Sequence, residues 1–215
     1  MTSRSEQHKE ELVGQVVRLA EKRLDRDRVA EVTRFLRAFY ANVPPDDMRE
    51  ESPDDLFGAA LSLWSFGAQR KPGSSKVRVY NPTTEENGWR SSHTVLEIVN
   101  DDMPFLVDSV TAALNGMDLT VYLVIHPVLK VERDAAGRRL ETGGKGAQLS
   151  ESFMQVRVSE QSSPQRLEAI RAEVERVLGD VRAAVGDWKP MLAKVGETLA
   201  ELDRVPPPLP ADELD

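Results

Sequence analysis

The residue types that most often carry chemistry are sparse and scattered in this chain. Its three histidines, His8, His93 and His126, have no partner at a metal-binding spacing such as HExxH. The chain has no cysteine, which excludes a thiolate nucleophile, a disulfide and cysteine-ligated zinc or iron–sulfur sites. It also has no GxSxG, GxGxxG or GxxxxGK[ST] motif. We therefore predict no catalytic residue, no metal site and no cofactor site here, and we interpret His126 as a packed or hydrogen-bonded histidine.

One segment combines polar side chains with the start of a helix. It consists of Asn100, Asp101, Asp102, Met103, Pro104 and Phe105. The segment follows a β-forming stretch, and the unpaired N–H groups of a helix N-terminus can hold a carboxylate. The alternative is that Asp101 or Asp102 only caps the helix, which is worth about 1 kcal/mol, with Pro104 in the first turn. Both interpretations stay open, because a cap and a ligand site can share one loop.

Other candidate motifs have simpler explanations. The glycines of residues 143–146 predict a flexible hairpin loop, because no helix follows them to favour phosphate binding. The carboxylate pairs Asp46-Asp47 and Asp54-Asp55 are typical of solvated helix starts. Trp64, Trp89 and Trp188 are interpreted as anchors within the core or between domains.

Composition narrows the class of protein. The chain has 215 residues, a formal net charge of −8 and 40% hydrophobic residues, which is an ordinary globular composition. The negative charge argues against a nucleic-acid partner, and Phe153 offers too little aromatic surface for an RNA-binding sheet. No apolar run is long enough to span a bilayer, and the N-terminus lacks the apolar stretch of a signal peptide. We expect a soluble cytoplasmic protein with neither a membrane nor a nucleic-acid partner.

The elements that would position these residues predict an α+β fold. Three helices precede residue 72, and a short strand surrounds Val77 and Val79. A β-α-β-β-α order follows between residues 93 and 182. It comprises a strand at 93–100, a helix closed by Asn115-Gly116, a strand at 119–133 interrupted at Pro127, a strand at 153–159 and a helix from Ser163. This order matches an incomplete ferredoxin-like unit, because a helix stands where a fourth strand should follow.

The same pattern suggests a division of the chain. We expect a helical N-terminal segment at 1–72, an α/β domain at 73–185, an amphipathic helix at 186–205 that starts near Asp187 and Pro190, and a proline-rich linker at 206–215. The closing VPPPLPADELD leads us to expect an N-terminal piece of a longer polypeptide.

Several stretches of the sequence resemble one protein family. They are NDDMPFLVDSV (100–110), LTVYLVIHPVLKVERD (119–134), ESFMQVRV (151–158), RVYNP (78–82) and the closing PPPLP. They resemble the N-terminal region of the large bacterial NAD-specific glutamate dehydrogenases. In that family, ACT-like modules linked to regulation and subunit contacts precede a distant catalytic domain.

The resemblance implies a non-catalytic regulatory or assembly module with an incomplete ACT-like unit. The parent enzyme would convert L-glutamate, NAD and water to 2-oxoglutarate, ammonia and NADH, with NAD bound outside these residues, so we expect this piece alone to be inactive. Expected partners are downstream domains of the same chain and further copies in a homo-oligomer.

The resemblance leaves two alternatives open, an effector module that binds a free amino acid at 100–105 and a purely structural oligomerisation domain. ACT domains that bind amino acids usually carry glycine after the proline, whereas this chain has Phe105, whose bulk we expect to fill that pocket.

Overall fold

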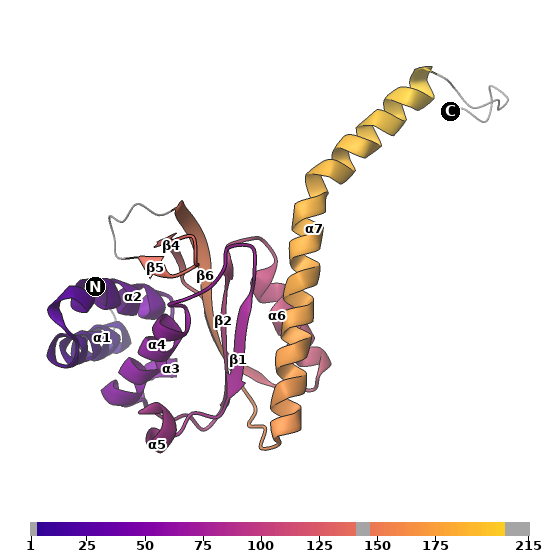
Figure 1. Cartoon of the computed structure of the whole chain (residues 1–215). Helices are drawn as coiled ribbons and strands as arrows, with labels where there is room; N and C mark the ends of the chain where they lie inside the picture. Colours follow the sequence, from indigo (N-terminus) through magenta and orange to yellow (C-terminus); the bar gives the residue numbers. More distant parts are fainter. Residues whose placement is uncertain (1–3, 141–146, 205–215) are drawn as a thin grey trace.

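A helical layer forms the N-terminal part of the chain (Figure 1). The computed structural model describes residues 4–140 and 147–204. The layer contains α1 (Arg4–Arg23), α2 (Arg26–Ala41), the short α3 (Pro45–Met48) and α4 (Pro53–Phe66). The prediction of three helices is therefore confirmed, with α3 as an additional single turn.

Helix α4 begins where the sequence predicts. The Ser52 hydroxyl accepts a hydrogen bond from the backbone N–H of Asp55 at 3.0 Å, and Pro53 occupies the first turn. This cap satisfies one of the donors that every helix N-terminus leaves unpaired. The helix then buries one side that includes Leu56, Ala60 and Leu63.

An antiparallel sheet forms the middle of the molecule. Its strands are β1 (Lys76–Tyr80), β2 (Thr94–Asp101), β3 (Val121–Ile125), β4 (Val128–Arg133), β5 (Arg139–Leu140) and β6 (Ala147–Val158). The order is β1-β2-β6-β4-β5, and β3 also pairs with β6. The remaining helices are α5 (Thr84–Asn87), α6 (Leu106–Gly116) and α7 (Pro164–Arg204).

The break expected at Pro127 is confirmed. Strands β3 and β4 pair with successive parts of the same edge of β6 and are separated by His126 and Pro127. Proline has no N–H to donate to the ladder. Its carbonyl still accepts a hydrogen bond from Phe153 N at 3.0 Å, which keeps the two short strands in line.

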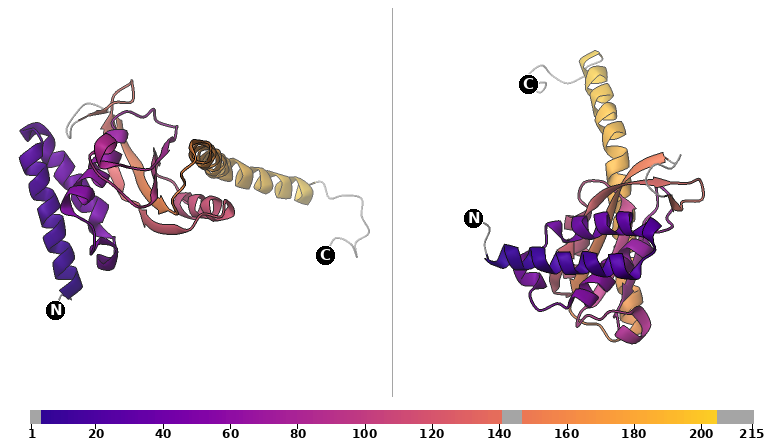
Figure 2. Two further views of the ribbon diagram at one scale, coloured as in Figure 1. Left: turned by 90° about the horizontal axis from the view of Figure 1, so that it is seen from below. Right: turned by 90° about the vertical axis from the view of Figure 1, so that its left-hand side faces the viewer.

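The sheet lies between two layers of helices (Figure 2). Helices α1, α2 and α4 pack with Val99, Val131 and Phe153 on one face. Helices α6 and α7 pack with Leu96, Met154 and Val156 on the other. Because consecutive residues of a strand point to opposite faces, β2 is buried along nearly its whole length. Both cores therefore depend on the same central strands.

One expectation about the second half of the chain is wrong. The helices predicted from Ser163 and from Asp187 form one 41-residue helix, α7, which runs through the boundary placed between 185 and 186 and bends along its length (Figure 1). Pro190 lies inside it. Proline kinks a helix by removing one hydrogen bond, but it need not end the helix.

The edge of the sheet beside β2 carries a strand that the predicted β-α-β-β-α unit did not include. Strand β1, which precedes the predicted unit in sequence, pairs antiparallel with β2 from Lys76–Val99 to Tyr80–Val95. Strand β1, which comes before the predicted unit in the sequence, therefore occupies the edge beside β2 where the unit has no strand of its own. The whole arrangement is consistent with an ACT-like α+β fold.

Two expectations lie outside the described residues. These are the glycine-rich loop at 143–146 and the linker at 206–215. Among the helices of the described part of the chain, none is both long and apolar enough to cross a membrane.

The packing of α4 on the segment after β1 gives a first prediction. A Cβ added at Gly58 would overlap the side chain of Trp89, whereas one added at Gly179 in α7 would meet no atom within 4 Å. Gly58→Ala should therefore lower the free energy of unfolding by about 1–3 kcal/mol. Gly179→Ala, the matched control, should raise it by about 0.5–1 kcal/mol, because alanine loses less backbone entropy in a helix. Urea denaturation of both variants measures this, and equal effects would contradict the packing described.

Candidate functional site

A cluster of five charged side chains joins the three layers at one end of the sheet. Its members, hereafter the junction cluster, are Arg70, Asp101, Arg133, Glu151 and Arg182. They come from the segment after α4, the ends of β2 and β4, the middle of β6, and α7. Residues far apart in sequence thus meet around two carboxylates.

Glu151 is the buried centre of the junction cluster. Arg133 donates to both carboxylate oxygens, Nε to Oε1 at 2.6 Å and Nη2 to Oε2 at 2.7 Å. Arg70 Nη2 donates to Oε1 at 2.6 Å. The side chains of Arg70 and Glu151 are 0% exposed and that of Arg133 is 1% exposed. A buried carboxylate is tolerated only when it is paired and hydrogen-bonded in this way.

The same arginines also hold the backbone of neighbouring segments. Arg133 donates to the carbonyl oxygens of Gly67 at 2.9 Å and Gly137 at 2.8 Å. Arg70 donates to the carbonyl of Ser74 at 2.7 Å. The guanidinium groups therefore donate hydrogen bonds to backbone carbonyl oxygens at the end of α4 and in two turns, in addition to the carboxylate.

Asp101 extends the junction cluster to α7. Its oxygens accept from Arg70 Nη2 at 2.8 Å, Arg182 Nη1 at 2.6 Å and the backbone N–H of Gly73 at 2.9 Å. Partial burial alone would raise the pKa of Asp101, but the hydrogen bonds from Arg70 and Arg182 outweigh it and hold the pKa below its ordinary value of 3.8. The carboxylate is therefore a structural anion at neutral pH.

The structure divides the segment predicted from 100 to 105 between several roles. Asn100 is fully buried, and its Oδ1 accepts a hydrogen bond from Arg182. The Asn100 Nδ2 atom has no hydrogen-bond partner among the described residues. Asp102 is exposed and its N–H donates to Ser150 O at 2.9 Å. Met103 is half-buried beside the α6–α7 core, and Pro104 is exposed. Ligand binding by this segment stays a prediction.

The expected helix cap is wrong. Helix α6 begins at Leu106, so Pro104 lies outside its first turn and neither Asp101 nor Asp102 is its cap. Phe105 is the cap residue, with φ +68° and without a side-chain cap hydrogen bond. A left-handed conformation is uncommon for a residue other than glycine. Its side chain is 66% exposed, so it does not fill a pocket as expected.

His126 is confirmed as a hydrogen-bonded histidine. Its Nε2 lies 2.6 Å from Ser152 Oγ, and burial lowers its pKa from the ordinary value. No group of metal-ligating side chains is present in the described part of the chain.

Sequence reasoning missed a buried polar row on the face of the sheet that meets the helical layer. Gln155 Nε2 donates to Ala59 O of α4 at 3.1 Å, and Arg157 pairs with Glu51. Glu97 accepts from Tyr80 Oη at 2.9 Å and pairs with Arg78. The alternation of Glu151, Gln155 and Arg157 with apolar residues is visible in the sequence. It is typical of a solvated face, and only the helical layer above it makes that face buried.

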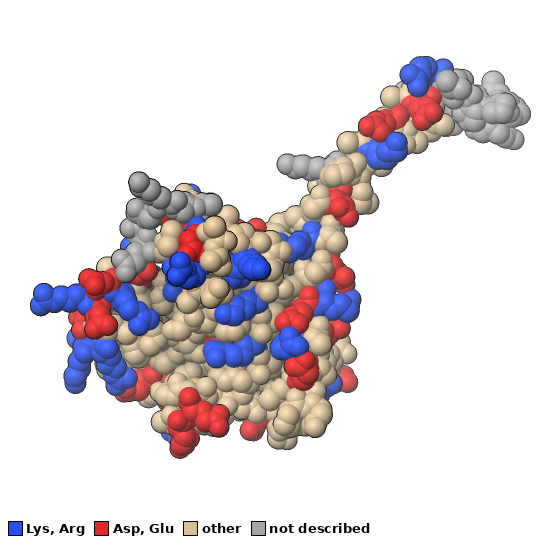
Figure 3. Space-filling view, in the orientation of Figure 1, with Lys and Arg blue, Asp and Glu red and all other residues tan. Residues whose placement is uncertain are grey.

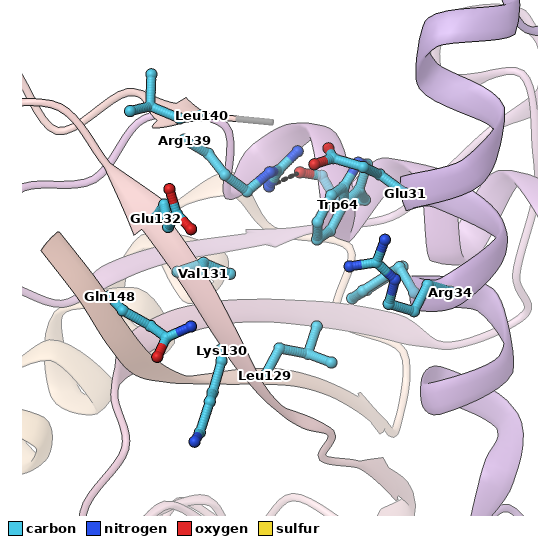
Figure 4. Close-up of a pocket in the computed structure, with 11 residues that line it drawn as sticks. Glu31, Arg34, Trp64, Leu129, Lys130, Val131, Glu132, Arg139, Leu140 and Gln148 are labelled. Atoms are coloured by element: carbon cyan, nitrogen blue, oxygen red, sulfur yellow. Dashed lines mark hydrogen bonds between the residues drawn. The ribbon is translucent and has the colours of Figure 1, made fainter. Parts of the chain in front are cut away.

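A cavity of about 200 Å³ opens where the helical layer meets the end of the sheet (Figure 4). Its walls come from α2, α4, β4, β5 and β6. The Arg139 guanidinium lies 3.2 Å from the centroid of the Trp64 ring, and its Nη1 donates to Trp64 O at 2.9 Å. No residue from 100 to 105 lines this cavity.

Comparison with known proteins decides the family. A family model described as "Glutamate dehydrogenase, ACT1 domain" matches residues 35–174. The chain belongs to this family. It is 40% identical over 201 residues to the NAD-specific glutamate dehydrogenase of Halomonas elongata, and 36% identical over 188 residues to that of Pseudomonas aeruginosa. These matches cover 92% and 86% of this chain, but only 12% of each relative.

A more distant relative gives the same family. The NAD-specific glutamate dehydrogenase of Mycobacterium tuberculosis is 26% identical over 174 residues, which is 74% of this chain and 10% of that protein. The ACT1 chain described here therefore corresponds to an N-terminal domain of a large NAD-specific glutamate dehydrogenase.

The junction cluster of this ACT1 chain gives a stability prediction. Glu151→Gln leaves two buried guanidinium groups without their shared carboxylate and should destabilise the fold by about 3–5 kcal/mol. The matched control is Glu168→Gln, which breaks an exposed pair with Arg171 on α7 and should have a much smaller effect on stability. Chemical denaturation compares the two, and a similar small loss in both would refute the central role of Glu151.

The lowered pKa of Asp101 gives a pH prediction. A carboxylate whose folded-state pKa lies below the unfolded value stabilises the fold above about pH 4, and this stabilisation is lost as the pH falls through the folded-state pKa. The free energy of unfolding should therefore decrease below pH 4, and the decrease should be shallower in Asp101→Asn. Denaturation between pH 5 and 3 tests this. An identical pH dependence in wild type and variant would contradict it.

Proposed function

We propose that this chain is an assembly and regulatory module of an NAD-dependent glutamate dehydrogenase. The complete enzyme would convert L-glutamate, NAD and water to 2-oxoglutarate, ammonia and NADH, with the nicotinamide cofactor bound outside these residues. Family membership and the names of the relatives support this reaction class. A non-catalytic role for the module itself agrees with its charged side chains, which serve the fold at the junction cluster.

One observation carries the assembly role, the uncovered apolar side of α7. In its final turns, large apolar side chains are about half to two-thirds exposed, namely Trp188 59%, Met191 60%, Leu192 52%, Val195 56%, Leu199 58% and Leu202 47%. Figure 1 shows this part of α7 projecting away from the sheet, and Figure 3 shows charged and uncharged side chains interspersed along it. We call these six residues the α7 stripe.

The spacing of the α7 stripe indicates a contact with another helix. Residues 188, 192, 195, 199 and 202 follow one another at intervals of four, three, four and three, the repeat that keeps one side of a helix facing a partner. The same helix buries Ile170, Val174 and Leu178 at comparable spacing against the sheet and α6. Its first half therefore belongs to this module, whereas its second half displays an apolar side with no partner among the described residues.

We infer that the remainder of the enzyme polypeptide covers the α7 stripe. The chain spans about 12% of the length of two relatives, so most of the mass of such an enzyme lies elsewhere in the same chain. The stripe also follows directly on the part of α7 that is fixed by Arg182 to Asp101. A movement of the covering domain would be transmitted to the sheet through this continuous helix. This mechanical connection is the basis for the regulatory part of the proposal.

We also infer that β1 completes the ACT-like unit. Its antiparallel pairing with β2 gives the sheet a strand at the edge where the predicted unit lacked one. Lys76 and Arg78 alternate along this edge strand, and Figure 3 shows basic side chains gathered over the same region. Charged residues on an edge strand oppose further strand pairing, so this edge is a poor candidate for sheet extension between subunits. Assembly through α7 is therefore favoured.

Charge insertion into the α7 stripe tests the assembly proposal. Val195→Glu combined with Leu199→Glu should leave the melting temperature of the 215-residue chain unchanged, because both side chains are exposed. In the complete enzyme the same pair should reduce both the oligomer seen by sedimentation and the turnover of glutamate with NAD.

The matched control exchanges charges outside the stripe. Lys194→Glu with Glu197→Lys reverses an exposed ion pair on the same turns and should affect neither the assembly nor the turnover of the complete enzyme. Wild-type assembly of the Val195→Glu, Leu199→Glu enzyme would refute the proposal. A dimer of the 215-residue chain that this double variant dissociates would show that a second copy covers the stripe.

A further inference from the structure

The cavity in Figure 4 differs from the junction cluster, because its charged groups surround open space. Arg34 reaches it from α2 and Arg139 from β5, on either side of Trp64 (Figure 4). Phe35 and Leu129 contribute apolar surface. A concave, largely apolar space with a few polar groups that converge on it is the usual form of a small-molecule site.

The charges around the cavity favour an anion. The cations Arg34, Lys130 and Arg139 outnumber the carboxylates Glu31 and Glu132 among its lining residues. Burial, reinforced by the positive charge of Arg133 and only partly opposed by the carboxylates of Glu31 and Glu151, lowers the pKa of Arg139 to about 10, so this guanidinium remains charged at neutral pH in a place that disfavours a cation. An anion bound beside it would offset that cost.

The volume and the donor geometry restrict the class of anion. A cavity of about 200 Å³ accommodates a small organic acid. A planar guanidinium forms paired hydrogen bonds with a carboxylate, and the Trp64 ring holds the Arg139 guanidinium from one side. A carboxylate fits these donors, and the apolar surface of Phe35 and Leu129 suits the carbon chain of an organic acid.

We propose that this cavity binds the carboxylate of a small organic acid, held by Arg34 and Arg139, with its carbon chain against Phe35, Trp64 and Leu129. The walls belong to both the helical layer and the sheet, so the bound acid would bridge the two. Glu132 also lines the cavity, and its buried Oε2 atom has no hydrogen-bond partner among the described residues. An ammonium group on the same acid would supply the missing donor. The two candidate ligands to distinguish are therefore a simple dicarboxylate and an amino acid.

Calorimetric titration of the 215-residue chain with glutarate and with L-glutamate tests the site, because the two acids differ in the α-amino group. At least one should bind saturably with one site per chain. Arg139→Gln should weaken that binding by about tenfold or more. Leu129→Phe, which fills the cavity and removes no charge, should weaken it as well.

The control variant is Arg138→Gln, which removes an exposed arginine adjacent in sequence that pairs with Asp134 and does not line the cavity. Its affinity should equal that of the wild type, and circular dichroism should show all variants folded. A higher affinity for L-glutamate than for glutarate would identify an amino acid as the ligand. Equal affinities would identify a simple carboxylate as the ligand. The absence of saturable binding in the folded wild type, or binding that both Arg139→Gln and Leu129→Phe retain, would overturn the proposal.

Discussion

The fold depends on placing one carboxylate, that of Glu151, where no water reaches it. A buried carboxylate must be paired and fully hydrogen-bonded, and here the partners come from the segment after α4 and from the end of β4. Arg133 in turn donates to the carbonyl oxygens of Gly67, at the end of α4, and Gly137, in a turn after β4. Arg70 also reaches Asp101, which binds Arg182 of α7. The helical layer, the sheet and α7 are therefore fixed to each other by a single charged cluster rather than by apolar packing alone.

This arrangement agrees with the proposed assembly role of the ACT1 module. The charged groups of the junction cluster join the layers. The exposed apolar side chains of the α7 stripe lie on the far half of α7, outside the core. In the proposed role, a helix that is fixed at one end and exposed at the other would link this module mechanically to the domain that covers the α7 stripe. The cavity beside Arg139 lies on the opposite side of the sheet from α7, at the boundary with the helical layer. Assembly and small-molecule binding would therefore use separate surfaces.

Local features were predictable from the sequence, whereas contacts between distant segments were not. The Ser52 cap, the end of α6 at Asn115-Gly116 and the break at Pro127 follow from short-range chemistry, and the structure confirms them. The burial of Gln155 and Arg157 depends on contacts with Ala59 and Glu51, about 100 residues earlier, which the alternation within the strand does not reveal. Asp187 and Pro190 predict the start of a separate last helix, because proline is common in a first turn, yet α7 continues through both residues. Phe105 was expected to be buried, because nothing in its neighbours signals a left-handed backbone with an exposed ring.

The measurement that tests the central claim most directly is native-state hydrogen exchange on the 215-residue chain. If the junction cluster fixes the three layers to each other, the slowest amides of α2, α4, β6 and the first half of α7 should exchange with the same opening free energy, that of global unfolding. The projecting half of α7 should exchange faster, because no other described residue packs on its apolar side. Exchange of α2 and α4 at a clearly lower opening free energy than β6 would show that the helical layer opens independently, and it would contradict this account.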